Sequence, residues 1–285
     1  MPVISMGRYA ARIAADTRDT RKAQRLRFRA FRAGREGAAG AADRLDRDDF
    51  DARCDHVLVE DRADGTAVAC FRVMALRDGS EIGRSYAAQH YALDRLRDFT
   101  GPMIEMGRFC LHPERRDPDI LRLAWAAMTR YVDAHAADML IGCSSFHGTD
   151  AERYLDSFAL LRQRHLAPEQ WRPRIKAPRV VRFARMLRGR TPDHRRAMQR
   201  MPPLLRSYLT MGGWVSDHAV VDPDLNTLHV FTGLEIRAMP AARKRLLRAT
   251  AAQGVTAGEG AAAGAGMAPH EGEGARGRGG VATSS

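Results

Sequence analysis

Three charged residues interrupt the apolar segments that most resemble β-strands. Arg72 lies within residues 69–74, and Glu105 and Arg108 lie within residues 103–110. Charged groups are seldom buried without a partner, because the lost hydration costs several kcal/mol. A buried glutamate can accept a proton, and a guanidinium group can hold a carboxylate through two parallel hydrogen bonds. At these apolar positions the three charges need oppositely charged partners, as in a structural ion-pair network or an active site.

Arg27 raises the same problem on a predicted helix. Asp16 or Thr17 can cap a helix that continues through an arginine-rich stretch to about residue 33. At about 100° of rotation per residue, Arg27 falls on the apolar side, near Leu26. The opposite side gathers six cations: Arg18, Arg21, Lys22, Arg25, Arg29 and Arg32. This outer face fits either a solvated surface or a docking surface for an acidic partner.

Carboxylates that could pair with these arginines lie in one acidic loop, at Asp48, Asp49, Asp51 and Asp55. In a flat strand, Glu105 and Arg108 would face opposite sides. A bulge at Gly107 would bring them to the same side. The spacing is compatible with a structural ion-pair network and equally with an active site.

Strands and helices of an α/β sheet must position these residues. Strand patterns cover residues 8–14, 56–59, 66–75, 103–111, 139–144, 214–221 and 227–236, with a hairpin turn at Asp64-Gly65. Further helices are predicted at 117–136, with Asp117 as cap and Pro118 at its first position, and at 149–164, 203–211 and 237–248. Residues 1–250 are predicted to form one domain. Residues 251–285, rich in Gly and Ala, are predicted to be a disordered tail.

The net charge of +12 would attract nucleic acid, anionic lipid or an acidic protein. We expect no nucleic acid, since no helix-turn-helix, zinc-finger or aromatic stacking motif accompanies the charge. The four cysteines lack metal or redox spacing and are predicted to be small packed side chains. No apolar run is long enough to span a membrane and no signal core is evident, so we expect a cytoplasmic protein.

The chain resembles the ornithine–acyl-carrier-protein N-acyltransferases of ornithine-lipid synthesis, a hemolysin-like family with a GNAT-type fold. The matching motifs run in order over residues 8–236: RLRFRAF at 25–31, DFDARCDH at 49–56, EMGRFCLHP at 105–113, GCSSFHGTD at 142–150, HLAPEQWRP at 165–173, PPLL at 202–205 and DPDLNT at 222–227. The resemblance implies a mixed, mostly antiparallel sheet flanked by helices, with a family-specific part at about 165–250. It also implies acyl transfer from acyl carrier protein to the α-amine of ornithine, the first step of ornithine-lipid biosynthesis, with no cofactor and no metal.

A weaker resemblance is to acyl-homoserine-lactone synthases, which also use acyl carrier protein. Their motif residues match Arg27, Phe31, Asp51, Asp55, Arg72, Glu105 and Arg108. This second resemblance implies that these residues form the amino-acid and thioester site.

The chain departs from acetyl-CoA-dependent members of the wider fold at the site for the acyl donor. Acetyl-CoA-dependent members of the wider fold carry a glycine-rich loop before the long helix, where backbone N–H groups surround the pyrophosphate. Here residues 115–120 contain no glycine, and Pro118 has no N–H. The site therefore suits the single phosphate of a carrier protein's phosphopantetheine arm, with Arg115 or Arg116 and the helix N-terminus as partners.

We expect Glu105 to take the proton of the attacking amine, directly or through a water, and N–H groups freed near Gly107 to stabilise the oxyanion. Arg27, Arg72 or Arg108 would hold the acceptor carboxylate. Asp51 or Asp55 would hold ornithine's distal ammonium or fix an arginine. The rival readings are another acceptor such as glutamine or glycine, an acyl-homoserine-lactone synthase, and a basic nucleic-acid binder. The basic helix at 237–248 fits either a solvated surface or a peripheral contact with anionic membrane.

Overall fold

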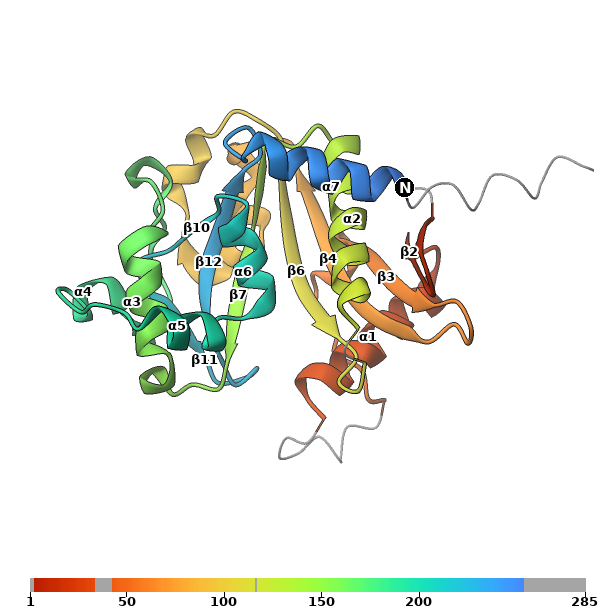
Figure 1. Ribbon diagram of the computed structural model, residues 1–285, viewed down its shortest axis with the longest axis horizontal. Coiled ribbons are helices and arrows are strands. Elements are labelled where there is room, and N and C mark those ends of the chain that lie inside the picture. The colour runs from red at the N-terminus through yellow and green to blue at the C-terminus, as the bar shows by residue number, and fades with distance from the viewer. Residues whose placement is uncertain (1–2, 34–42, 116, 254–285) are drawn as a thin grey trace, which may run out of the picture.

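A ten-stranded sheet forms the centre of the computed structural model, which describes residues 3–33, 43–115 and 117–253 (Figure 1). Its strand order is β1-β2-β3-β4-β6-β7-β12-β11-β9, and β10 pairs with β12. The strands are β1 Ile4–Met6, β2 Tyr9–Ile13, β3 Asp55–Asp61, β4 Ala67–Leu76, β6 Met103–Leu111, β7 Met139–His147, β9 Val180–Val181, β10 Trp214–Val215, β11 Ala219–Asp222 and β12 Thr227–Glu235. A separate two-stranded sheet joins β5 Tyr91–Ala92 to β8 Arg174–Ile175.

Seven α-helices surround the sheet within the described residues. They are α1 Thr17–Phe31, α2 Pro118–Ala134, α3 Leu155–Arg164, α4 Phe183–Met186, α5 His194–Arg200, α6 Pro203–Thr210 and α7 Ala241–Gln253. Short 3-10 turns lie at η2 Asp51–Arg53, η3 Gly79–Arg84, η4 Ala87–Gln89, η5 Asp94–Asp98, η6 Ala151–Tyr154 and η7 Glu169–Trp171. The helix caps follow the sequence: Asp16 accepts from the N–H of Asp19 on α1, and Asp117 precedes Pro118 on α2.

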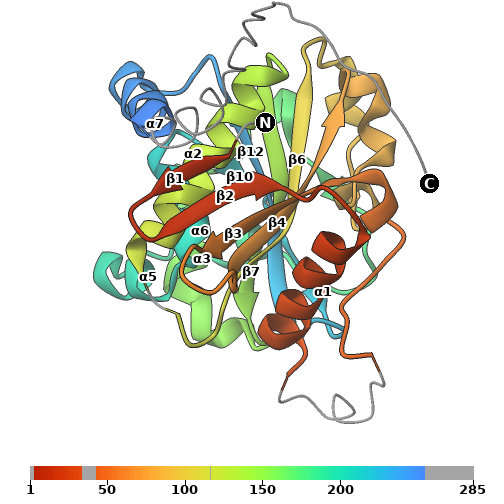
Figure 2. The ribbon, with the colours of Figure 1, turned by 90° about the vertical axis from the view of Figure 1, so that its right-hand side faces the viewer.

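Helices cover the two faces of the sheet in different ways (Figure 2). On one face, which we call the α2 face, α2 packs against Val57 and Phe71. On the other, the α1 face, α1 packs against Leu58 and Cys70. Successive strand residues alternate between faces. Val57 and Leu58, which are adjacent in β3, therefore lie in opposite cores, as do Cys70 and Phe71 in β4. Helices α3, α4 and α5 form a further core over the C-terminal strands.

The sheet is antiparallel except where β6 runs parallel to β7, and there the two strands pair only briefly. Their register extends from Met103 opposite Met139 to Met106 opposite Gly142. A Cβ atom on Gly142 would lie 2.4 Å from the carbonyl oxygen of Met106, so this close approach requires glycine. Beyond this point β7 continues along β12 while β6 continues along β4. A gap therefore opens between β6 and β7 within one sheet.

A β-bulge in β6 lies beside this gap. Arg72 of β4 is opposite Gly107, but Cys70 is opposite Cys110, so β6 carries one extra residue. Arg108 takes the left-handed backbone conformation, with φ 51°. The sequence places the bulge at Gly107, and the structure places the irregular residue at Arg108, one position further on. The predicted consequence is confirmed, since Glu105 and Arg108 both meet the segment at Tyr86 on the α1 face.

Several predicted boundaries change in the folded chain. The strand expected at 139–144 extends to His147, and the helix expected from 149 begins as a 3-10 turn before α3. The strand expected at 214–221 is two strands, because Ser216 and His218 turn the chain between β10 and β11. The last helix starts at Ala241, after Pro240, and continues to Gln253. The rest of the predicted tail lies outside the described residues.

Candidate active site

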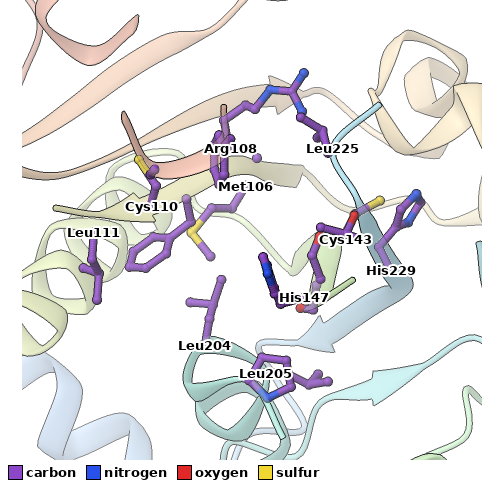
Figure 3. A pocket seen from close by; sticks show the side chains of 18 of the residues that line it. Met106, Arg108, Cys110, Leu111, Cys143, His147, Leu204, Leu205, Leu225 and His229 are labelled. Atoms are coloured by element: carbon purple, nitrogen blue, oxygen red, sulfur yellow. The ribbon is translucent and has the colours of Figure 1, made fainter. Parts of the chain in front are cut away.

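A cavity of about 420 Å³ occupies the gap between β6 and β7 (Figure 3). Strand residues after the parting point line it from both sides, including Arg108 and Phe109 from β6 and Cys143 and His147 from β7. The α1 face contributes polar groups, among them Arg72, Tyr86, Glu105, Asp222 and His229. The α2 face contributes apolar groups, among them Met106, Leu111, Leu121, Leu204 and Leu205. One cavity thus joins a charged half to an apolar half through the sheet.

Glu105 is buried at the wall of the cavity, with 5% of its surface exposed. Its two carboxylate oxygens accept hydrogen bonds from the backbone N–H groups of Tyr86, at 2.6 Å, and Ala87, at 2.8 Å. Burial raises the pKa of Glu105, and this effect outweighs the two backbone hydrogen bonds and the charge of Arg72, which lower it. The raised pKa makes Glu105 a stronger base than an ordinary glutamate.

Arg27 and Arg72 form a closed ion-pair network with the acidic loop. Arg27, with 1% of its surface exposed, binds both oxygens of Asp51 at 2.7 Å and lies 3.2 Å from the carboxylate of Asp46. Arg72 binds the carboxylate of Asp48 and, at 2.8 Å, that of Asp51. Burial alone would raise the pKa of Asp51, but the hydrogen bonds and charge of Arg27, with Gln24 and Arg72, hold it below its ordinary value. Both guanidinium groups are therefore already paired with carboxylates.

Arg108 differs from these two arginines, because it extends from the bulge toward the cavity. It donates to Asp48 at 3.0 Å, and its Nε is buried with no hydrogen-bond partner, although Asp46 lies 3.4 Å away. Its guanidinium group also lies 5.3 Å from the ring centre of Tyr86. Of the three predicted carboxylate-binding arginines, Arg108 retains the most capacity for a ligand.

Asp55 lies away from the other predicted site residues. It accepts a hydrogen bond at 2.7 Å from the hydroxyl of Tyr131 on α2, so it belongs to the α2 face. His56, next in the chain, turns to the α1 face and its Nε2 lies 3.1 Å from the carbonyl of Asp51. The placement of Asp55 beside Arg27 and Glu105 was wrong, because alternation along β3 directs it to the opposite face. Phe31, at the end of α1, does line the cavity.

The predicted partners for the phosphate of the acyl donor are Arg115, Arg116 and the N-terminus of α2. Arg115 does not line the cavity, and its charge acts on Asp61 and Asp64 of the β3–β4 hairpin. Arg116 lies outside the described residues. At the N-terminus of α2, the carboxylate of Asp117 already accepts from the N–H of Asp119 at 2.9 Å. This cap leaves less N–H capacity for a phosphate than the sequence alone indicates.

Several residues in or next to the cavity were not singled out from the sequence. Asp46 is fully buried and completes the arginine network, and Tyr86 and Ala87 supply the N–H groups to Glu105. Asp222 opens the DPDLNT motif, so its motif gave a signal that residue types alone did not. His229 lies in an ordinary strand pattern and gave none.

The four cysteines differ in their burial. Cys70 and Cys110 are buried with their sulfurs 3.5 Å apart, and Cys54 and Cys143 are partly buried; all four are free thiols. Among the described residues, no group of His, Cys, Asp or Glu has the arrangement of a metal site. Within the same part of the chain, no helix has the length and apolar character needed to cross a bilayer.

Comparison with known proteins shows that the chain is similar to N-acyltransferases. Residues 26–126 match the acetyltransferase (GNAT) domain family, which agrees with the predicted fold class. An L-ornithine N(alpha)-acyltransferase of Rhodobacter capsulatus is 36% identical over 199 residues, covering 67% of this chain and 75% of that protein. The corresponding protein of Brucella abortus is 30% identical, covering 66% and 69%.

Solved structures that align with most of this chain include the following two. The AHL synthase LasI aligns with a TM-score of 0.41 and 15% identity, over 82% of this chain and 93% of its own. FeeM, an N-acyl amino acid synthase from uncultured soil microbes, aligns with a TM-score of 0.45 and 11% identity, over 81% and 94%.

Proposed function

The chain belongs to the L-ornithine N(alpha)-acyltransferase family, and we propose that it transfers a fatty acyl group from a thioester to the α-amine of L-ornithine. The observation that carries this proposal is one cavity in which buried Glu105 and partly buried Arg108 lie beside an apolar compartment. An amino acid needs the charged half and a fatty chain needs the apolar half. The gap between β6 and β7 joins the two.

The charged half would bind and deprotonate the acceptor. Arg108 is the residue that best fits the α-carboxylate, because it lines the cavity and its Nε donates no hydrogen bond within the described residues, although the carboxylate of Asp46 lies 3.4 Å away. Glu105 would take a proton from the α-ammonium, directly or through a water, so that the free amine attacks the thioester carbonyl. The C–N bond forms as the C–S bond breaks, the proton held by Glu105 passes to the departing thiolate, and the second ammonium proton lost on amide formation is released to water. The extra residue of a bulge loses its ladder partner, so the N–H of Arg108 is a candidate donor to the oxyanion.

The apolar half would hold the acyl chain. Phe109 and Leu111 of β6 pack with the core of the α2 face and line the cavity. Leu204 and Leu205 of α6 line it as well (Figure 3). Each buried CH₂ contributes about 0.8 kcal/mol, so a compartment of this kind favours a long acyl chain over an acetyl group.

Acyl carrier protein is the donor that we propose, with ornithine-lipid synthesis as the pathway. Pro118 and the carboxylate cap of Asp117 make the start of α2 a poor site for the pyrophosphate of CoA. Arg115 remains a proposed partner for the single phosphate of the phosphopantetheine arm. No bound cofactor is needed for aminolysis of a thioester.

The outer face of α1 would dock the acidic carrier protein. Arg18, Arg21, Arg25 and Arg29 are exposed on it, whereas Lys22 binds Glu60 and Arg32 binds Asp46. The last turn of α1, at Ala30 and Phe31, lines the cavity, so this face adjoins the site. We also propose a peripheral contact of α7 with anionic membrane, since Leu246 is 56% exposed among basic side chains.

Charge reversal on α1 tests the docking face. The variant R25E/R29E is expected to raise the KM for acyl-acyl-carrier-protein by about tenfold, because each lost surface ion pair contributes up to about 1 kcal/mol. The KM for ornithine should stay unchanged. The matched variant R243E/R245E changes the same number of charges on α7 and should leave both KM values as they are. Equal effects of the two variants would show a general charge effect rather than a docking face.

The proposed reaction is tested with the purified protein, acyl-acyl-carrier-protein and a set of amino acids. Mass spectrometry is expected to find N-acyl ornithine, with glutamine and glycine giving at least tenfold less product. A preference for glutamine or glycine would show that ornithine is not the natural acceptor. An acyl-homoserine lactone formed from S-adenosylmethionine would replace the reaction, and the absence of any acylated product would overturn the proposal.

A further inference from the structure

Asp222 of β11 and Thr227 and His229 of β12 bring three hydrogen-bond acceptors to one part of the cavity wall. Asp222 is directly opposite Thr227 in the antiparallel register, and Val220 is directly opposite His229. Residues two apart on a strand share a face, so Asp222, Thr227 and His229 lie on one face as direct or diagonal neighbours. All three line the cavity.

Asp222 brings a carboxylate without a counter-charge. It is buried, and one of its oxygens accepts a hydrogen bond at 2.9 Å from the N–H of Leu225. Within the described ranges, no lysine, arginine or histidine forms an ion pair with it. A buried carboxylate with no cation is costly, unless a ligand supplies the positive charge.

His229 brings a second acceptor, and its tautomer follows from its contacts. The hydroxyl of Tyr91 lies 2.8 Å from the carbonyl oxygen of His229 and 3.1 Å from its Nδ1. A carbonyl can only accept, so the tyrosine donates its single proton there and Nδ1–H donates to the tyrosine oxygen. Nε2 then carries the lone pair. His229 is only 2% exposed, and this Nε2 has no partner in the described structure.

The electrostatic surroundings keep His229 neutral. Burial, together with the neighbouring His90 and His218, lowers its pKa to about 3. Thr227 adds a third acceptor, since its Oγ1 is buried with no hydrogen-bond partner. Asp222, Thr227 and His229 form a corner of the cavity. This corner offers a carboxylate, a hydroxyl and a neutral imidazole nitrogen, all with free lone pairs.

We propose that Asp222, Thr227 and His229 form the subsite that binds the distal ammonium group of the acceptor amino acid. The inference rests on the proposed function and adds the determinant of acceptor choice. A primary ammonium group has three N–H donors and one charge, and the corner has three acceptors and one opposite charge. The sequence assigned this role to Asp51 or Asp55, but Asp51 is held by Arg27 and Arg72, and Asp55 is on the α2 face.

The subsite would select against neutral acceptors. A side chain without a cation would leave these buried acceptors unpaired, and sites built around polar groups discriminate strongly for that reason. Glutamine offers an amide in place of the ammonium and glycine offers nothing. Ornithine would thus be preferred through its side chain, while Arg108 and Glu105 act on the α-amino acid part shared by all acceptors.

The test compares ornithine with norvaline, which has the same carbon chain without the ammonium group. Wild type should favour ornithine in kcat/KM, and D222N should lower the ratio of ornithine to norvaline by about 10- to 100-fold. Asparagine keeps an acceptor for the N–H of Leu225, so the turn is preserved. The value for norvaline should stay within about twofold. D224N, two residues away and exposed, is the matched control and should keep the wild-type ratio.

Two outcomes would separate failure of the subsite from failure of the function. If wild type acylates ornithine preferentially and D222N keeps that ratio, the subsite is overturned and the proposed function stands. If wild type acylates ornithine and norvaline equally well, the subsite is overturned and the acyl transfer stands; if it acylates neither, both are overturned. T227V, a substitution of similar shape, should lower the same ratio about threefold and raise the calorimetric Kd for ornithine; an unchanged ratio and Kd would also overturn the subsite.

Discussion

Replacing Glu105 with glutamine is expected to lower kcat by about 100- to 10,000-fold, the range of a lost general base. Glutamine has nearly the same shape and can still accept one hydrogen bond from the N–H groups of Tyr86 and Ala87. It cannot take a proton. Steady-state kinetics with saturating ornithine and acyl donor will measure the loss, and circular dichroism will show whether the variant is folded.

The pH profile provides a second measure of Glu105. A base must be unprotonated to act, so wild-type kcat should fall as the pH drops through the pKa of Glu105. Since burial raises that pKa, the acid limb is expected above pH 4.5, the ordinary value for glutamate. E105Q should lack this limb. A folded E105Q with a near wild-type rate and the same acid limb would exclude Glu105 as the base.

Replacing Asp51 with asparagine is expected to destabilise the protein by about 3–5 kcal/mol, the cost of breaking a buried ion pair. Asp51 is the only carboxylate in the described residues that binds both Arg27 and Arg72. Its loss leaves two buried guanidinium groups short of negative charge. Urea unfolding followed by fluorescence will give the free energy of unfolding. D49N removes an exposed carboxylate of the same loop and should change that value by less than about 0.5 kcal/mol.

Low pH should weaken the same ion-pair network and lower the free energy of unfolding. The pKa values of Asp48 and Asp51 are lowered in the folded state, so their contribution to stability is present above their unfolded pKa of about 3.9 and is lost as pH falls through the folded values. Wild type should therefore lose stability below about pH 4, and D51N should lose less over that interval. An equal pH dependence in both proteins, or an unchanged free energy of unfolding for D51N, would mean that the network does not hold the fold.

The arginine network and the cavity have different roles, although the sequence predicts a single site for both. Arg27, Arg72, Asp46, Asp48 and Asp51 satisfy one another and hold α1, the acidic loop and β4 together. Glu105 and Arg108 reach the cavity beside that rigid assembly. We infer that the network positions these two residues and that ligands meet Arg108 rather than Arg27 or Arg72.

The sequence by itself determined the elements and the inward direction of several charges. The caps Asp16 and Asp117, the apolar periodicity of α1 and α2, and the strand pattern of β6 follow from local chemistry, and each matches the structure closely. The burial of Arg27, Arg72 and Glu105 also follows locally, because each lies at a position where its neighbours are apolar.

Only the tertiary structure decided which of these charges meet. Asp55 and Asp51 are four residues apart, yet alternation along β3 sends Asp55 to Tyr131 while the preceding turn leaves Asp51 with Arg27. Asp222 and His229 come together through the register of β11 with β12, and Tyr86 reaches Glu105 from a segment without regular structure. Strand register and long-range pairing depend on the packing of the whole sheet, and a shift of one residue would reverse every side chain. Local sequence therefore fixes which groups must be buried, but the assembled sheet fixes their partners.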